Sequence, residues 1–176
     1  MSVTSKVNPN FVVQVQPGEY KSFLKSLKAF EEGEVIASLE GVTRAPKSYR
    51  TVQCGLGPKD HIELNSDFVY VNHSCEPNTA FDLSSPNPAD WHIRALRRIE
   101  AGDALGFFYP STEWDMDQPF SCECGTKTCL GIIQGAKYLS KEELLARRWV
   151  SPWILDLKSK RIDQNSKVSA KISSRL

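Results

Sequence analysis

Three of the five cysteines in this chain fall within eight residues, as Cys122, Cys124 and Cys129. Three thiolates this close together are well suited to bind a tetrahedral Zn²⁺, at a zinc–sulfur distance of about 2.3 Å. Gly125 and Gly131 interrupt the same segment and let its backbone fold around an ion. The Cys-x-x-Cys spacing of a redox pair is absent, so the cluster predicts a zinc site.

A tetrahedral structural zinc site needs a fourth ligand, which the cluster itself does not supply. The other cysteines and the histidines of the chain provide the candidates for that ligand: Cys54, Cys75, His61, His73 and His92. Their spacing from the cluster does not choose among them.

Length and composition describe one soluble globular domain of 176 residues, with 40% hydrophobic and 24% charged residues. The formal net charge of +1 argues against a broad basic surface, so we expect no direct nucleic-acid partner. Residues 1–10 lack the apolar run of a signal peptide, and no stretch approaches the roughly 18 apolar residues of a membrane span. We therefore expect no membrane partner and an intracellular location, in the nucleus or the cytoplasm, where cysteines indicate metal binding before disulfides.

Hydrophobic periodicity predicts many short strands, long loops and little helix. A helix is predicted over residues 20–32, because apolar residues recur at helical spacing from Phe23 to Phe30 and Gly33 follows as a stop. A capping box of Ser140 and Glu143 predicts a second helix near the C-terminus. The remaining apolar segments are short or alternate with polar residues, and they predict strands at 11–15, 34–39, 68–71, 81–83, 91–99 and 104–109.

Residues 72–78 read Asn-His-Ser-Cys-Glu-Pro-Asn, and they resemble the N-H-S-C-x-P-N signature of the SET-domain family of lysine methyltransferases. Downstream, residues 105–109 are similar to that family's E-L-T-F-D-Y strand. Residues 122–131 are similar to its post-SET pattern C-x-C-G-x-x-x-C-x-G, and residues 33–36 to its G-E-x-I/V segment. The chain is identified as a member of the family because these motifs occur in the family's order.

The resemblance implies a mainly β protein with the SET-domain (β-clip) fold, in which small curved sheets surround a threaded pseudoknot. The Asn-His-Ser-Cys segment and the aromatic strand would lie side by side, and a post-SET zinc loop and a short C-terminal helix would follow. The expected divisions are an N-terminal tail (1–10), the SET domain (11–120), the post-SET zinc loop (121–135), a C-terminal helical segment (136–157) and a disordered basic tail (158–176).

The resemblance also implies the roles of single residues. Asn72 and His73 match positions that contact the cofactor S-adenosylmethionine, and Tyr109 matches the catalytic tyrosine, which also borders the cofactor. Cys75 matches the position of the fourth ligand of the structural Zn²⁺, so the implied site is Cys75, Cys122, Cys124 and Cys129.

Three further aromatic or apolar residues lie in or beside the motifs that carry the resemblance. Phe107 stands where the family varies between Phe and Tyr, and a Phe there leaves room for di- or trimethylated product. Phe120 and Leu130 are expected to border the cofactor, although simple packing explains Phe120 about as well.

The chain departs from the family pattern near its N-terminus, where residues 21–23 lack the glycines of the family's G-x-G turn. Leu39, Ala104 and Phe108 also stand where the family has a tyrosine, an acidic residue and an aspartate. Three functions remain open. The preferred one is an S-adenosylmethionine-dependent methyltransferase that acts on a protein lysine, such as a histone tail. The others are an enzyme for a small-molecule amine or other small substrate, and a non-catalytic interaction module held together by zinc.

Overall fold

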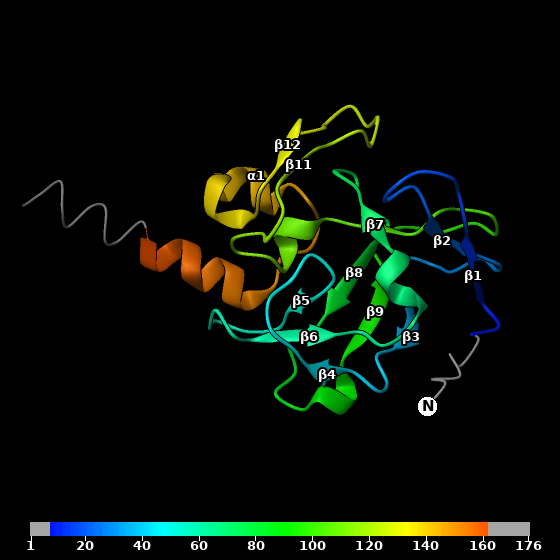
Figure 1. Ribbon diagram of the computed structural model, residues 1–176, viewed down its shortest axis with the longest axis horizontal. Coiled ribbons are helices and arrows are strands. Elements are labelled where there is room, and N and C mark those ends of the chain that lie inside the picture. The colour runs from blue at the N-terminus through cyan, green and yellow to red at the C-terminus, as the bar shows by residue number, and fades with distance from the viewer. Residues whose placement is uncertain (1–7, 162–176) are drawn as a thin grey trace, which may run out of the picture.

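The computed structural model describes residues 8–161 as a set of small β-sheets with few helices (Figure 1). The strands of this part of the chain are β1 (Phe11–Gln14), β2 (Phe23–Ser26), β3 (Val35–Ser38), β4 (Thr43–Arg44), β5 (Val52–Gln53), β6 (His61–Glu63), β7 (Asn72–His73), β8 (Thr79–Asp82), β9 (His92–Ala95), β10 (Gly106–Phe107), β11 (Phe120–Ser121) and β12 (Ile132–Ile133). The helices are the 3-10 turns η1 (Asp67–Tyr70), η2 (Pro88–Asp90), η3 (Tyr109–Ser111) and η4 (Ala136–Tyr138), the α-helix α1 (Lys141–Leu145), and residues 152–161. The mainly β architecture of small sheets expected from the sequence is confirmed.

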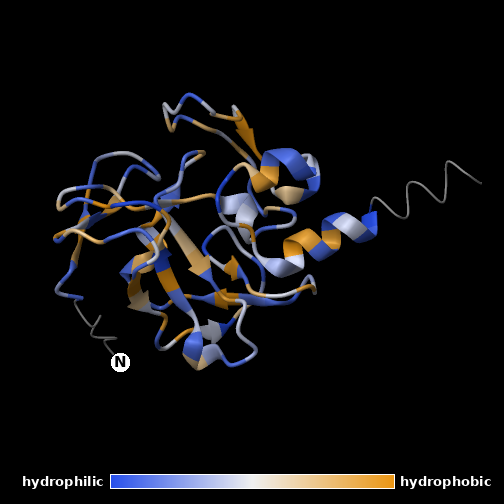
Figure 2. Cartoon of the chain, turned by 180° about the vertical axis from the view of Figure 1, so that it is seen from behind, coloured by the Kyte–Doolittle hydropathy of each residue, from blue (hydrophilic) through white to orange (hydrophobic). Residues whose placement is uncertain are grey.

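Two three-stranded antiparallel sheets form the middle of the molecule, in the orders β3-β9-β8 and β4-β6-β5. Burial alternates along β9, where Ile93 and Ala95 are buried and His92 and Arg94 are partly exposed. This period of two is what one buried sheet face requires. Figure 2 shows strongly hydrophobic colour on these central strands, and also on β12 and the last helix; the core includes the fully buried Phe81.

Strands β7 and β10 pair in parallel, although more than thirty residues separate them along the chain. Asn78 holds this region together: its side chain donates to the Ala104 carbonyl at 2.8 Å and accepts from the Gly106 N–H at 2.8 Å. A Cβ on Gly106 would lie 3.1 Å from the Ser74 Cβ, so the close approach of the two segments favours glycine. The two motif segments therefore lie side by side, as the sequence predicted.

The helix predicted over residues 20–32 is wrong. Residues 23–26 form β2, which pairs with β1 in antiparallel register from Phe11↔Ser26 to Gln14↔Phe23. Leu24 is fully buried, whereas Leu27, which shares its face in the helical pattern, is 51% exposed. Strand pairing thus overrides an accidental helical period, because it satisfies the backbone and still buries Leu24.

The strand predicted over residues 68–71 is also wrong, because residues 67–70 form the 3-10 turn η1 and pairing begins only at Asn72. Elsewhere the predicted strands occur at or near their expected places, with boundaries shifted by a few residues. The strand predicted at 81–83 begins earlier, at Thr79.

The C-terminal region contains the predicted helix α1, whose capping box is present in full: Ser140 and Glu143 each accept from the other's backbone N–H. The predicted boundary of the tail at residue 158 is wrong, since residues 152–161 are helical. Lys158 is buried, and its ammonium donates to the carbonyls of Ala136 and Lys137. The rest of the predicted tail, 162–176, and residues 1–7 lie outside the described part of the chain. Among residues 8–161, no helix combines the length and the apolar character needed to cross a bilayer.

Candidate active site

A cavity of about 790 Å³ lies between the β1–β2 connection, the segment before β5, strand β7 and the segment that leads into β11. The structure brings five of the residues predicted for catalysis or cofactor binding to this cavity, and two of the predicted metal ligands, Cys122 and Cys124, also border it: the five are Asn72, His73, Phe107, Tyr109 and Phe120. Leu130, which was also predicted to contact the cofactor, does not border this cavity. It borders a smaller hollow beside Pro110 and β12, and its backbone N–H lies 3.4 Å from the Cys75 Sγ. The predicted contact of Leu130 with a cofactor therefore stays a prediction.

Asn72 connects the cavity to the N-terminal hairpin. Its side-chain Nδ2 donates to the Ser22 carbonyl at 2.9 Å, and Ser22 also borders the cavity. The chain lacks glycines at residues 21–23, but the backbone at Ser22 is still held against β7. Just before it, Tyr20 has a φ of 59°, in the left-handed region that favours glycine. The N-terminal segment thus turns sharply at this edge of the cavity without the family's glycine pair.

His73 lies within a cluster of aromatic rings, 5.6 Å from Phe108, 5.2 Å from Tyr109 and 5.7 Å from Phe120 between ring centroids. Its Nδ1 accepts from the Tyr109 backbone N–H at 3.2 Å, which leaves the proton of the neutral ring on Nε2. Burial, assisted by the positive charge of Arg147, lowers the pKa of His73 to about 4. His73 is therefore a neutral positioning group that holds the backbone at Tyr109.

Tyr109 begins the turn η3, directly after the motif strand β10. Burial raises the pKa of its hydroxyl to about 12, so the group stays protonated at physiological pH. It can orient a neighbouring atom through its hydrogen bond, but it is unsuited to act as a base. Phe107 lies between Phe81 and Tyr109, at ring-centroid distances of 4.5 and 4.7 Å, and it also borders the cavity.

The four cysteines named from the resemblance come together in space. The sulfur atoms of Cys75, Cys122, Cys124 and Cys129 all lie within 4.8 Å of one another. Zinc–sulfur bonds of about 2.3 Å in a tetrahedron would place the sulfurs about 3.8 Å apart. The Cys75 and Cys122 sulfurs are 4.0 Å apart, so the donor set fits a tetrahedral Zn²⁺.

The structure separates Cys54 from this cluster, since its sulfur lies 3.3 Å from the Arg44 guanidinium in a different sheet. Cys75 follows β7 directly, whereas the other three cysteines lie between β11 and β12. A metal at this site would therefore join the β11–β12 loop to the segment that supplies Asn72 and His73. Burial raises the pKa of the Cys75 thiol, and a bound cation would counteract that effect by stabilising the thiolate.

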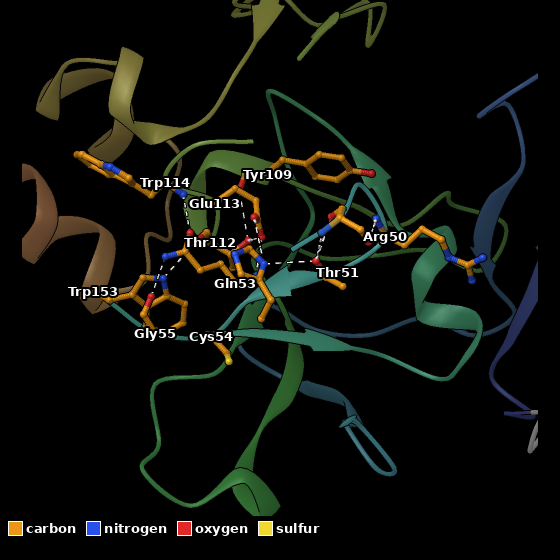
Figure 3. A network of polar contacts seen from close by, with 12 residues as sticks. Arg50, Thr51, Gln53, Cys54, Gly55, Tyr109, Thr112, Glu113, Trp114 and Trp153 are labelled. Carbon is orange, nitrogen blue, oxygen red and sulfur yellow. Dashed lines mark hydrogen bonds and ion pairs between the residues drawn. The ribbon is translucent and has the colours of Figure 1, made fainter. Parts of the chain in front are cut away.

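Two buried charged residues beside these sites were missed by the sequence reasoning. Glu113 follows Tyr109 by one turn and borders the cavity, and Arg147 lies against the cysteine cluster. The Glu113 Oε1 accepts from the Gln53 backbone N–H at 2.6 Å and the Thr112 hydroxyl at 3.3 Å (Figure 3). Burial raises its pKa to about 7, although both hydrogen bonds act in the opposite direction. Nothing in the sequence distinguishes Glu113 from the acidic residues Asp115 and Asp117 that follow it.

Comparison with known proteins agrees with this arrangement. The family model described as the SET domain matches residues 21–110. The chain belongs to the SET-domain family. Among its relatives, Methyltransferase flvH of Aspergillus flavus is 42% identical over 139 residues, which cover 78% of this chain and 75% of that protein.

Other relatives of this SET-domain protein carry the name histone-lysine N-methyltransferase. The protein ash1 of Drosophila melanogaster is 35% identical over 77 residues, and EHMT1 of Homo sapiens is 39% identical over 69 residues. The matched segments cover 43% and 34% of this chain, but only 4% and 5% of those proteins. Membership of a methyltransferase family is thus shown, and the acceptor of the methyl group is the question that follows.

Proposed function

We propose that this SET-domain protein transfers a methyl group from S-adenosylmethionine to the side-chain amine of a lysine in a protein, with a histone tail as one such substrate. One observation carries the proposal: Asn72, His73, Tyr109 and Phe120 come from three separate segments and meet at one cavity. A protein that binds histones would be expected in the nucleus, and a cytoplasmic protein substrate would fit the same cavity.

The chemistry requires a neutral amine, because its lone pair attacks the methyl carbon while the methyl–sulfur bond breaks. A free lysine has a pKa of about 10.4, so its proton must leave to solvent before attack. A buried position beside a sulfonium cation favours that loss. Tyr109, whose hydroxyl stays protonated, would orient the reacting atoms.

The proposed roles of His73 and Phe120 follow from the aromatic cluster. Their rings lie 5.7 Å apart and form part of one wall of the cavity. A planar adenine could pack against such a surface, whereas Asn72 presents polar atoms to the same cavity. His73 is neutral, so it would not repel the cationic sulfonium.

We further propose that the four-cysteine site holds a structural Zn²⁺, because its sulfur spacing fits a tetrahedron. The expected stoichiometry is one zinc ion per chain, measured by mass spectrometry under native conditions. Cys129→Ser should lose the metal and loosen the β11–β12 loop. Cys54→Ser is the matched control and should retain it, because Cys54 lies outside the cluster. Zinc retained in full by Cys129→Ser would refute the four-cysteine assignment.

The enzymatic proposal is tested by mass spectrometry of histone octamers incubated with the full chain and S-adenosylmethionine. Tyr109→Phe should bind the cofactor with unchanged affinity but lose at least about 100-fold in kcat, because only the orienting hydroxyl is removed. Calorimetric titration with S-adenosylmethionine supplies the second measurement. No binding at millimolar cofactor would exclude both enzymatic hypotheses and leave the hypothesis of a non-catalytic interaction module.

A small-molecule amine is the second candidate substrate. Two observations favour it: the insert between residues 41 and 67 is short, and flvH, which matches 78% of this chain, is named simply as a methyltransferase. The same assay run with free L-lysine separates the candidates. Methylation of free lysine without methylation of histones would replace the protein substrate by a small one.

A further inference from the structure

The carboxylate of Glu113 stands apart from the groups that bind the cofactor and the reacting amine. Its side chain is 11% exposed, and Glu113 borders the cavity. Its backbone N–H donates to the Tyr109 carbonyl at 3.0 Å, so the fold fixes Glu113 one turn after the tyrosine. In Figure 3 the Tyr109 ring and the Glu113 side chain leave this turn in different directions. The carboxylate therefore belongs to the same cavity but to a different part of it.

The two hydrogen bonds that this carboxylate accepts both go to the same oxygen. Oε1 accepts from Gln53 and Thr112, whereas Oε2 has the His61 Nδ1 at 4.0 Å. Burial, with help from the charge of Lys47, lowers the pKa of His61, so the imidazole is neutral at physiological pH and supplies no counter-charge. Among residues 8–161 no lysine or arginine forms an ion pair with Glu113, and Lys47 acts on it only from outside contact distance.

A buried carboxylate without a cationic partner costs free energy, because ionisation in a poorly solvated position is unfavourable. A bound ligand that carries a positive charge would offset this free-energy cost. Every substrate of the proposed reaction is an amine, and a cavity acid is complementary to a cationic group on it.

We propose that Glu113 forms a cation subsite of the substrate cavity, which binds a second ammonium or guanidinium group of the substrate while the reacting amine lies near Tyr109. The inference rests on the proposed function in one respect, that an amine occupies this cavity. It adds a substrate class: amines that carry another positive charge at a distance, as in a diamine or a basic peptide.

A structural role alone is the competing explanation, since Glu113 also joins β5 to the turn η3 through the Gln53 N–H. Glu113→Gln separates the two roles. The amide oxygen can still accept from Gln53, but the negative charge is lost. A structural role would appear as a change in melting temperature with no change in ligand preference.

The experiment measures equilibrium binding of simple amines to the full chain by calorimetry, so it needs no methyl transfer. The probes are linear diaminoalkanes of increasing length, each compared with the n-alkylamine of the same length. The measurement is made at about pH 8.5, where the amines are protonated and Glu113 is ionised. Glu19→Gln is the matched control, because Glu19 is an exposed carboxylate that borders the same cavity.

For the wild type and Glu19→Gln, one diamine length should bind at least about tenfold more tightly than its monoamine, which corresponds to about 1.4 kcal/mol. Glu113→Gln should lose that preference and keep its affinity for the monoamine. Equal binding of diamine and monoamine by the wild type, a preference that survives in Glu113→Gln, or no binding at any length would each overturn the subsite. Absence of methyl transfer in a protein that shows the preference would instead count against the proposed function.

Discussion

Arg147 connects the C-terminal region to the cysteine cluster, and its substitution should weaken that connection. It is 7% exposed, and its guanidinium donates to the Cys75 carbonyl at 3.0 Å and to the hydroxyl and carbonyl of Thr128 at 2.6 and 3.0 Å. The Phe108 ring lies 5.4 Å from the guanidinium carbon. One side chain thus connects the segment after α1, the cysteine loop and the motif segment that supplies Cys75.

The magnitude for Arg147→Met follows from these bonds. A hydrogen bond from a charged group contributes about 1.5–3 kcal/mol, and a buried carbonyl left without a partner costs about 1–3 kcal/mol. Cys75 is fully buried, so its carbonyl would be stranded, whereas Thr128 is exposed and water can replace the guanidinium there. The guanidinium also has a buried Nε without a hydrogen bond, whose loss is slightly favourable. The expected loss of unfolding free energy is therefore about 2–4 kcal/mol, not the sum of three bonds.

Two measurements check this prediction. Urea unfolding should show the loss of stability, and the melting temperature should fall by about 5–15 °C for a chain of this length. Zinc release to a chelator should become at least about tenfold faster, because Cys75 loses its anchoring contact. Arg147→Lys should be intermediate, since one ammonium cannot replace the planar fork of donors.

Arg97→Met is the control, because Arg97 is an exposed arginine, and it should change neither quantity. A stability loss below about 1 kcal/mol for Arg147→Met, with zinc release as slow as in the wild type, would refute the reasoning. A loss of stability with unchanged zinc release would show that Arg147 supports the C-terminal region alone.

Three further predictions concern other parts of the molecule. If the protein methylates lysine, the wild type should form di- or trimethyl product, and Phe107→Tyr should stop at monomethyl by mass spectrometry; monomethyl product from both would contradict this. Gly135 has a φ of 119°, and a Cβ there would lie 2.6 Å from the Trp114 carbonyl oxygen, so Gly135→Ala should lose more than about 2 kcal/mol in urea unfolding. Gly41→Ala, at φ 73° with open space around it, should lose only about 1 kcal/mol, and equal losses would rule out the clash. The pKa of Glu113 rises on folding from about 4.3 to about 7, so wild-type stability should fall as pH rises between these values. Glu113→Gln should therefore gain up to about 3 kcal/mol relative to the wild type between pH 4 and pH 8, and parallel pH profiles would show that the carboxylate is solvated.

The parts of the site that could be predicted from the sequence are those carried by short, contiguous motifs. The cysteine cluster predicts a metal because three sulfur ligands within eight residues can bind one ion after a local fold of the backbone. The Asn72–His73 segment and Tyr109 were identified through family motifs, and the structure brings them to one cavity as expected. Sequence reasoning also found α1, because the Ser140–Glu143 capping box is a local interaction.

The errors arose where the deciding contacts are distant along the chain. Residues 23–26 have a helical period but form a strand, because the spacing of apolar residues does not report the backbone pairing with β1 that decides their structure. The tail boundary was wrong for a similar reason: Lys158 looks like a residue of a basic tail until the carbonyls of η4 accept from its ammonium. Amino-acid composition does not show which groups a charged side chain contacts, so it could not indicate that Lys158 is buried.

The sequence by itself determined the family, the close spacing of three candidate metal ligands and the residue types proposed for methyl transfer, because each is a property of residue types at fixed spacing. Only the tertiary structure decided which groups face one another. It placed Cys75 with the distant cluster, held Ser22 against Asn72, surrounded Arg147 with carbonyls and left Glu113 in the cavity with the His61 Nδ1 4.0 Å from its second oxygen. The physical reason is that burial and pairing depend on segments far apart in sequence, and these set the charge state of a side chain and the ligand it can bind.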